Sequence, residues 1–332
     1  MSLALHGLTA TVPASIPSPP ASTFPVFGLT IHYYALCIIA GIIVAGLIAN
    51  HRLTRRGAEK WIVIDIAILA VPLAIIGARI FHVLTHPGFY FGVGSNPWNP
   101  FEHGSVWAIW EGGIAIFGAL IGGAIGAWLG CRWTGIRFSA FADALAPGLL
   151  LAQAMGRFGN WFNQELFGLP TDLPWGLQID PANPAFPPGL AADTLFHPTF
   201  LYEVVWNGLG VLVLLWLGRR FTLQWGRLFA CYLIWYSAGR VVWESIRIDP
   251  SEVLLGLRSN VWAAIIGVAV GIVILVVQGR RHTGVEPSAY RDGRQPAEPV
   301  VDSEDDSHGY VDLSEPPADD IDAGAAATST AP

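Results

Sequence analysis

Charged residues are scarce in this chain of 332 amino acids. Asp, Glu, Lys and Arg together make up 13% of the sequence, whereas hydrophobic residues make up 53% and the mean hydropathy is +0.48. A soluble domain needs more polar surface than this composition supplies. The sequence therefore excludes a soluble fold and predicts a polytopic membrane protein.

Cysteine is rare as well. Cys37, Cys131 and Cys231 lie far apart, in or beside apolar stretches. This placement argues against disulfides, a metal cluster and a cysteine nucleophile, and it favours buried, unreactive thiols.

The net charge of −7 is unevenly distributed. Residues 282–332 hold 12 acidic and 2 basic residues, a balance of −10, whereas Met1 to Arg281 has a balance of +3. The basic residues fall in short clusters between apolar stretches, so nothing suggests nucleic acid binding. Residues 282–332 are predicted to form an acidic, disordered tail. Residues 1–25 contain no Lys or Arg, which argues against a signal peptide, and are expected to form a flexible extramembrane leader.

Apolar stretches recur seven times between these ends, each roughly the ~20 residues needed to cross a bilayer. They are Ile31–Asn50, Trp61–Leu84, Val106–Gly130, Phe138–Gln153, Thr199–Gly218, Arg227–Glu244 and Val261–Gln278. We therefore expect residues 26–281 to form an all-α membrane domain of about seven transmembrane helices. Small residues recur every four positions in the third stretch and predict close helix packing; they are Gly118, Gly122, Gly126 and Gly130.

The basic residues give the orientation of these spans. Lys and Arg follow every odd-numbered span, whereas the loops 85–105 and 158–198, after the second and fourth spans, carry none. The positive-inside rule therefore places the N-terminus outside and the C-terminus in the cytoplasm. Arg247 and Arg258, expected on the outer side, are the exception.

A polar segment, Met155 to Gly168, follows the apolar run of the fourth span. It contains Arg157, two asparagines and Glu165, spaced by glycines. Ionisable groups at membrane depth usually face a cavity or a partner, and glycine lets the backbone turn and approach a ligand. A structural ion pair at a helix end is one interpretation. We favour the other, an anion-binding active site at the outer membrane surface.

A second polar group lies near the end of the sixth span. Tyr236, Arg240, Glu244 and Arg247 are spaced at i, i+4, i+8 and i+11, which is one face of a helix. Two guanidinium groups flanking a carboxylate suit a phosphate or carboxylate ligand. A structural Arg–Glu–Arg ladder would explain the same pattern.

Further polar residues lie on the same expected side. His197, Tyr202 and Glu203 open the fifth span, and Glu203 lies one turn into the membrane. Arg79, near the outer end of the second span, could join the site, whereas Asp143 near the inner end of the fourth is interpreted as structural. Arginines and carboxylates from several spans thus converge on one leaflet. This predicts a pocket for an anionic lipid head group, with arginines holding its phosphate.

These residues resemble the prolipoprotein diacylglyceryl transferase family. The similarity covers roughly Thr30 to Gln278 and includes the signature Gly156-Arg157-x-Gly159-Asn160-x-x-Asn163-x-Glu165-x-x-Gly168. The other matching blocks are His32-Tyr33-Tyr34, Gly77-Ala78-Arg79-Ile80, Trp110-Glu111-Gly112-Gly113, His197-Pro198-x-x-x-Tyr202-Glu203 and Tyr236-x-x-x-Arg240-x-x-x-Glu244-x-x-Arg247.

The resemblance implies an enzyme of the bacterial cytoplasmic membrane whose active site faces the outer leaflet. It would transfer the sn-1,2-diacylglyceryl group of phosphatidylglycerol to the lipobox cysteine of prolipoproteins and release glycerol 1-phosphate, without cofactor or metal. By the same resemblance, catalysis would involve Arg157, Arg240, Glu203, Glu244 and His197. Substrate binding would involve Arg157 with Asn160, Asn163, Glu165, Gly168, Tyr34, Arg79, Tyr202, Tyr236 and Arg247.

Two positions depart from the family pattern. Trp161 replaces a phenylalanine, which is a conservative change, and Phe117 occupies the position of a histidine often assigned as the base. His197, Glu203 and Glu244 remain as candidate bases. Our hypothesis is that the arginines lower the pKa of the substrate thiol enough for a weak base or water to suffice.

Two other classes of function fit parts of the sequence. A carrier could use an arginine-lined cavity, but the chain shows neither an inverted repeat nor paired broken helices. An intramembrane hydrolase would need a nucleophile, but Ser139, Ser237 and Ser245 lack a G-x-S-x-G context.

Overall fold

The computed structural model describes residues 15–92 and 96–294. The helices are α1 (Tyr33–Thr54), α2 (Ile62–Thr85), α3 (Pro87–Tyr90), the 3-10 helix η1 (Ile109–Glu111), α4 (Ile116–Thr134), α5 (Phe138–Asn163), α6 (Thr199–Phe221), α7 (Arg227–Ser245) and α8 (Ser259–Arg281). Six of them, α1, α2, α4, α5, α6 and α8, are long and apolar enough to cross a membrane. The predicted all-α polytopic membrane fold is confirmed.

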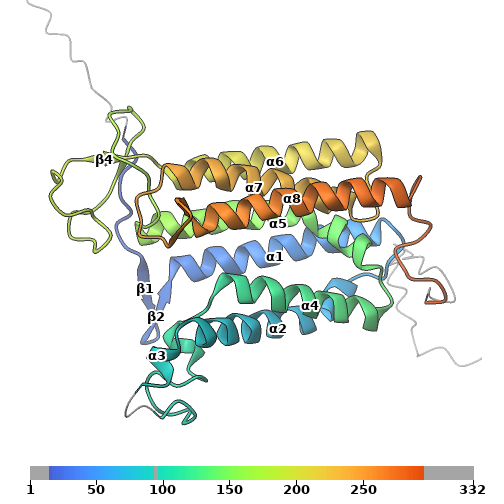
Figure 1. Cartoon of the computed structure of the whole chain (residues 1–332), viewed down its shortest axis with the longest axis horizontal. Helices are drawn as coiled ribbons and strands as arrows, with labels where there is room; N and C mark the ends of the chain where they lie inside the picture. The colour runs from blue at the N-terminus through green and yellow to red at the C-terminus, as the bar shows by residue number, and fades with distance from the viewer. Residues whose placement is uncertain (1–14, 93–95, 295–332) are drawn as a thin grey trace, which may run out of the picture. The chain divides into compact units, whose positions relative to one another are not determined.

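The sixth predicted span, Arg227–Glu244, corresponds to α7. This helix is 19 residues long and packs against α5, α6 and α8, so it lies within the bundle (Figure 1). Arg227, Arg240 and Glu244 make it more polar than the other six long helices. A polar helix is stable inside a membrane bundle when its charged groups face protein partners.

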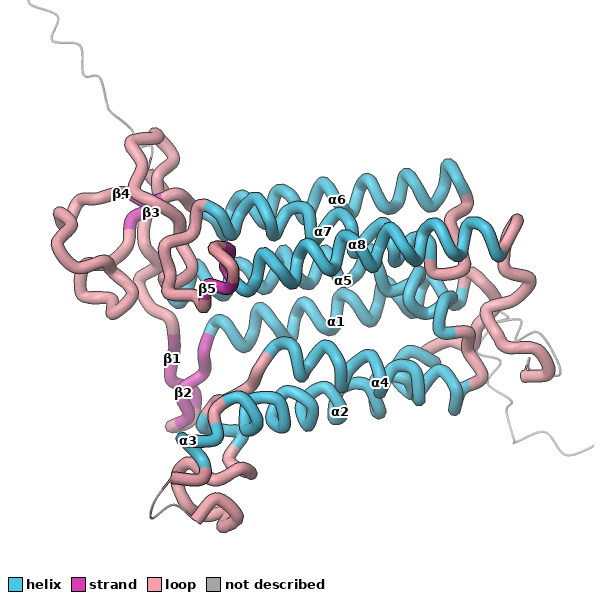
Figure 2. The backbone as a smooth tube through the Cα atoms, in the orientation of Figure 1, coloured by secondary structure: helices cyan, strands magenta, loops and turns pink. Residues whose placement is uncertain are grey.

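The long helices pack around α5. Helices α1, α6 and α7 all contact α5, while α2 and α4 form a separate close pair and α7 packs on α8 (Figure 2). The glycines of the predicted packing ridge lie where α4 meets α2. A Cβ atom at Gly118, Gly122 or Gly126 would overlap backbone carbonyl oxygens of α2. The close helix packing predicted from this repeat is confirmed.

One end of the bundle carries short strands and long loops. Three antiparallel hairpins lie there: β1 (Thr23–Val26) with β2 (Leu29–His32), β3 (Leu177–Gln178) with β4 (Leu195–Phe196), and β5 (Val253–Leu254) with β6 (Leu257–Arg258). We call this the signature end, because α5 finishes there with the polar signature. The expected leader contributes to it, since Ile16 bridges to Leu177 and β1 pairs with β2. Residues 1–14 lie outside the described residues.

The opposite end, which we call the basic end, carries the arginine clusters in and just after the last turns of α1, α4, α6 and α8. Residues 283–294 fold back onto it after α8, and we call them the C-terminal clasp. Within the clasp, the buried Glu286 forms an ion pair with Arg56 and accepts a hydrogen bond from Ser139 Oγ at 2.5 Å. The buried Tyr290 bridges to Ile136 of the α4–α5 loop. The sequence assigned these residues to the disordered tail; the remainder of that tail, 295–332, lies outside the described residues.

Two predicted spans have different limits. The third begins at Ile116, because Gly112 and Gly113 have φ of 93° and 71° and end the apolar run that starts at Val106. The fourth continues beyond Gln153 as α5 to Asn163, so the first part of the polar signature forms the last two turns of a helix, and Glu165 and Gly168 lie in the loop after it. The apolar pattern did not predict this extension of α5, because the polar residues in it face protein and not lipid.

Candidate active site

The glycines of the signature serve helix packing. Gly159 lies inside α5, and a Cβ atom there would lie 2.5 Å from Cδ2 of Tyr34 at the start of α1. The chain leaves the helix only at Gln164, which adopts the left-handed conformation with φ 51°. The predicted backbone turn is therefore placed after Asn163, and Tyr34 is brought against the signature helix.

Asn160 connects the signature arginine to the carboxylate of Glu165, and Asn163 binds the same carboxylate. Arg157 Nη1 donates to Asn160 Oδ1 at 3.3 Å, and Asn160 Nδ2 donates to Glu165 Oε1 at 2.9 Å. Asn163 Nδ2 donates to the same Glu165 oxygen at 3.2 Å. This chain of hydrogen bonds orients the amides and leaves the other nitrogens of Arg157 for further partners.

Arg157 and Arg240 meet at one carboxylate. Arg157 Nη2 lies 2.6 Å from Glu203 Oε2, and Arg240 Nη1 lies 3.7 Å from Glu203 Oε1. Both arginine side chains keep 14% of their surface exposed, whereas Glu203 keeps 4%. Within the described chain, the buried Arg240 Nη1 has no hydrogen-bond partner. An unused guanidinium N–H at a partly open edge is a donor available for an anionic ligand.

Glu244 lies behind these arginines with no exposed side-chain surface. Its Oε2 is 2.6 Å from Arg240 Nη2 and 3.0 Å from Arg247 Nη1, and its Oε1 accepts from Asn260 Nδ2 at 2.9 Å. A carboxylate buried this deeply is stable only with such partners. The Arg–Glu–Arg ladder considered from the sequence therefore exists, and it holds Arg240 in place beside Glu203.

Two residues of this cluster escaped the sequence analysis. Asp249 takes a bidentate pair from Arg247 at 2.7 and 2.8 Å, and Arg258 lies 2.9 Å from Glu244 and 3.0 Å from Asp249. Burial alone would lower the pKa of Arg247, but its hydrogen bonds to Asp249 and the nearby carboxylates outweigh that effect and raise it. The sequence did contain a signal for this cluster. Arg247 and Arg258 were the exceptions to the positive-inside rule, because they were expected on the outer side.

His197 and Tyr202 connect the signature loop to α6. His197 Nδ1 lies 3.1 Å from the hydroxyl of Tyr202, which also accepts from Trp175 Nε1 at 3.1 Å. Gly168 N donates to His197 O at 3.0 Å, and a Cβ atom at Gly168 would lie 2.8 Å from His197 Cβ. His197 is half-buried. Gly168 thus allows the loop to approach His197 closely.

Tyr236 lies one turn of α7 before Arg240, away from the ion pairs. Its ring stacks on Tyr232 with centroids 6.1 Å apart, within the apolar contacts of α5, α6 and α7. The structure therefore gives Tyr236 a packing contact and no hydrogen bond to the arginine cluster in the described part of the chain. Its assignment to substrate binding stays a prediction.

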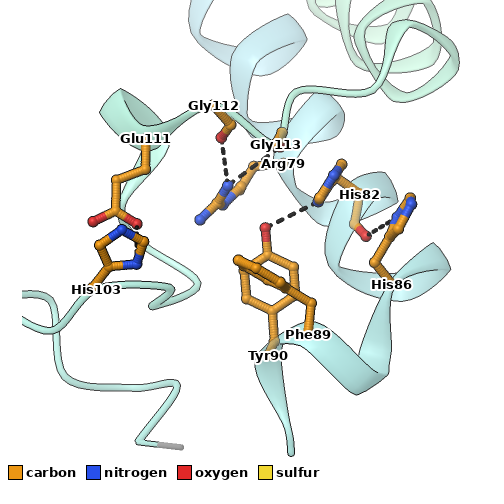
Figure 3. A pocket seen from close by; sticks show the side chains of 9 residues that line it. All are labelled: Arg79, His82, His86, Phe89, Tyr90, His103, Glu111, Gly112 and Gly113. Atoms are coloured by element: carbon orange, nitrogen blue, oxygen red, sulfur yellow. Dashed lines mark hydrogen bonds and ion pairs between the residues drawn. The ribbon is translucent and has the colours of Figure 1, made fainter. Parts of the chain in front are cut away.

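Arg79 lines a cavity that contains no residue of the arginine cluster. Its guanidinium donates to the carbonyl oxygens of Val106 at 2.8 Å, Ser105 at 2.6 Å and Gly112 at 2.7 Å, so its donors hold the loop before α4. Figure 3 shows it in a cavity of about 330 Å³ with three histidines and Glu111. The geometry favours a structural role for Arg79, and its substrate-binding role stays a prediction.

The position of the missing family histidine is apolar in this chain. Phe117 lies at the start of α4 with its ring centroid 6.1 Å from that of Phe81. The serines considered for a hydrolase are engaged elsewhere: Ser139 donates to Glu286 and Ser245 to the carbonyl oxygen of Val242. Ser237 is buried.

The fold and this cluster together define a polytopic membrane protein with a buried arginine–carboxylate site at one end of its helix bundle. Comparison with known proteins agrees with the resemblance seen in the motifs. The chain belongs to the prolipoprotein diacylglyceryl transferase family, whose sequence model matches residues 22–277.

Several curated relatives are similar over most of their length. The phosphatidylglycerol–prolipoprotein diacylglyceryl transferase of Leifsonia xyli is 60% identical over 88% of this chain and 89% of its own. The enzyme of the same name from Cutibacterium acnes is 47% identical over 83% of this chain and 90% of its own. One from Streptomyces coelicolor is 44% identical over 84% of this chain and 86% of its own.

Proposed function

We propose that this chain transfers the sn-1,2-diacylglyceryl group of phosphatidylglycerol to the lipobox cysteine of prolipoproteins and releases glycerol 1-phosphate. Membership of the family and the names of the relatives support this activity. The structural observation that carries it is the meeting of Arg157 and Arg240 at Glu203, where Arg240 Nη1 makes an ion-pair contact at 3.7 Å but has no hydrogen-bond partner in the described residues. Two guanidinium groups at one partly open edge suit a phosphodiester.

The reaction forms one bond and breaks one. The cysteine sulfur attacks the primary carbon of the diacylglyceryl group that carries the phosphate, and the carbon–oxygen bond breaks. The electron pair leaves with the phosphate as glycerol 1-phosphate, and the thiol proton passes to a base. Arg157 and Arg240 stabilise the charge that develops on the leaving phosphate.

The geometry separates the three candidate bases. Glu244 is fully buried and bound by Arg240, Arg247 and Asn260, so we assign it to positioning Arg240. Glu203 lies between the two phosphate-binding arginines, and His197 is half-buried beside the signature loop. We keep Glu203 and His197 as the candidates for receiving the thiol proton.

We place the protein in the bacterial cytoplasmic membrane with the signature end at the outer leaflet. The arginine clusters of the opposite end support this orientation. A cysteine-labelling experiment tests it in a variant without the native cysteines. Ala185→Cys, exposed at the signature end, should react with an impermeant thiol reagent in intact cells, whereas Thr283→Cys, exposed at the basic end, should react only after permeabilisation. The reverse pattern would invert the topology.

The activity is tested by Arg157→Ala and Arg240→Ala. Each purified variant is mixed with phosphatidylglycerol vesicles and a lipobox peptide, and release of glycerol 1-phosphate is measured. We expect each to lose about 10²–10³-fold in rate, the usual effect of removing a charge-stabilising donor. Arg220→Ala, at the basic end, is the matched control and should keep its activity. Full activity in both test variants would remove these arginines from the chemistry.

A further inference from the structure

The basic end contains a second cavity, which is separate from the site of the proposed reaction. It encloses about 560 Å³ between the ends of α1 and α6, with α5 behind it. Helices α1 and α6 each pack on α5 but hardly on each other, which leaves the space between them. The arginines that line it are Arg52, Arg55, Arg56 and Arg219, and His51 lies beside them.

Most of this positive charge forms no salt bridge within the described residues. Arg56 is bound by Glu286 of the C-terminal clasp, but Arg52, Arg55 and Arg219 make no salt bridge to any residue that the structure describes. Asp143 also lines the cavity, but its two carboxylate oxygens accept from the backbone N–H groups of Gly226 and Phe229, at 2.8 and 2.9 Å. It therefore fixes the start of α7.

Arg52 is the most deeply placed of the unpaired arginines. Its Nη2 reaches only the backbone oxygen of Asp143, at 3.5 Å, and its buried Nε has no hydrogen-bond partner in the described chain. Buried polar groups normally find partners, so an unsatisfied guanidinium nitrogen at a cavity wall indicates a ligand.

The cavity has apolar walls next to its arginines. Leu47 and Ile48 of α1, with Val211 and Leu215 of α6, lie one to two turns deeper in the bundle than Arg52 and Arg219. Leu47 keeps 48% of its surface exposed. A charged rim above an apolar crevice fits an amphiphile whose anionic group lies at the membrane surface and whose chains extend inward.

We propose that this cavity binds the phosphodiester head group of an anionic phospholipid, whose acyl chains lie along α1 and α6. Sixteen residues of α6 separate Glu203 from Arg219, or about 24 Å along the helix, so this lipid is not the one that reacts. The positive-inside rule requires basic residues in the loops but requires neither a cavity nor a buried unpaired nitrogen. The bound lipid neutralises the unpaired arginines and joins α1 to α6.

Adjacent arginines on α6 provide a matched test. Arg219 lines the cavity, whereas Arg220 does not and its guanidinium lies over the ring of Phe221 at 5.2 Å. Both are exposed and occupy the last turn of the helix, so Arg219→Gln and Arg220→Gln remove the same charge from neighbouring positions. Arg52→Gln removes the deeper donor.

Binding is measured by native mass spectrometry of the full chain in a zwitterionic detergent, titrated with dioleoylphosphatidylserine. We expect Arg219→Gln to bind this lipid about fivefold more weakly than wild type, and Arg52→Gln at least about tenfold more weakly. Arg220→Gln should stay within about twofold of wild type. Arg219→Gln should keep its release of glycerol 1-phosphate, which separates this site from the proposed reaction.

Three results would overturn the proposal. Equal weakening by Arg219→Gln and Arg220→Gln would mean that the lipid senses only the general positive charge of this end. Full displacement of the lipid by inorganic phosphate at millimolar concentration would mean that the cavity takes free phosphate. Retained binding in Arg52→Gln would place the head group elsewhere.

Discussion

Both ends of the helix bundle are rich in arginine, but the charged partners of the arginines differ between the two ends. At the signature end, Arg157, Arg240 and Arg247 each lie within 3.0 Å of a carboxylate oxygen supplied by another residue of the same cluster. At the basic end, Arg52 and Arg219 border a cavity with no salt bridge among the described residues. Arginine content alone therefore does not identify an active site.

The difference follows from what each end has to do. Basic residues that set the orientation in a membrane need only lie on one side of it, and water or lipid phosphates can neutralise them. Arginines that hold a reacting phosphate must be fixed in direction before the substrate arrives, and buried carboxylates provide that fixation. The network around Glu244 fixes its arginines with a buried carboxylate, as the proposed reaction requires, whereas Arg52 and Arg219 at the basic cavity are not fixed in this way.

The largest effect is expected from removing the central carboxylate of the signature end. Glu244→Ala leaves Arg240 and Arg247 buried without their shared partner, and breaking a buried pair in this way costs about 3–5 kcal/mol. Unfolding in detergent, followed by tryptophan fluorescence, measures the loss. Glu252→Ala, an exposed carboxylate in the loop that follows α7, is the control and should change stability by less than about 0.5 kcal/mol. Equal stability of the two variants would show that the ladder is dispensable.

The next effect concerns the C-terminal clasp, whose Glu286 forms an ion pair with Arg56 of the basic cavity. Ending the chain after Arg281 removes Glu286 and with it the ion pair to Arg56 and the hydrogen bond from Ser139. We expect a loss of about 2–3 kcal/mol, less than for Glu244 because Arg56 is partly exposed and can be hydrated.

Ending the chain after Arg294 is the matched control for that truncation. It keeps every described residue of the clasp and should leave the unfolding free energy unchanged. If both truncations were equally stable, the clasp would have no structural role. If both were equally unstable, the stabilising contacts would lie beyond residue 294.

A smaller effect is expected at the exposed edge of the signature end. Asp249→Asn removes the charge that pairs with Arg247 and Arg258, but the Asp249 side chain is 22% exposed and water can replace part of the interaction. We expect a loss of about 1–2 kcal/mol in the same unfolding experiment. A loss as large as that of Glu244→Ala would show that burial does not rank these carboxylates.

The sequence predicts the helices well, because apolar runs of bilayer length are a strong signal. It misplaces two boundaries for a shared reason. Val106 extends an apolar run yet gives its carbonyl oxygen to Arg79, and Asn163 interrupts one yet belongs to α5. Hydropathy reports the environment of a side chain averaged over many proteins, whereas these residues face particular partners.

The candidate site was predictable in part. Helical spacing placed Arg240, Glu244 and Arg247 on one face. The ion pair between Glu244 and Arg258 depends on the β5–β6 hairpin folding back, a long-range contact that spacing does not encode. The sequence did not predict the clasp, because the composition around it is acidic. Only two residues, Glu286 and Tyr290, make most of its buried contacts.

The smallest expected effect is that of salt on stability. It distinguishes the two ends most directly, because its sign at the basic end should reverse when lipid binds. In lipid-free detergent, the unpaired arginines of the basic end repel one another, and raising NaCl from 0.1 to 1 M shortens the Debye length from about 10 Å to about 3 Å. Wild type should gain up to about 1 kcal/mol of stability, and Arg219→Gln should gain less.

With dioleoylphosphatidylserine bound, the same salt should destabilise wild type, since it weakens the attraction between lipid and arginines. The buried pairs of the signature end are screened far less, so Asp249→Asn should follow wild type in both conditions. A salt response of one sign throughout would mean that no anionic lipid neutralises the basic end.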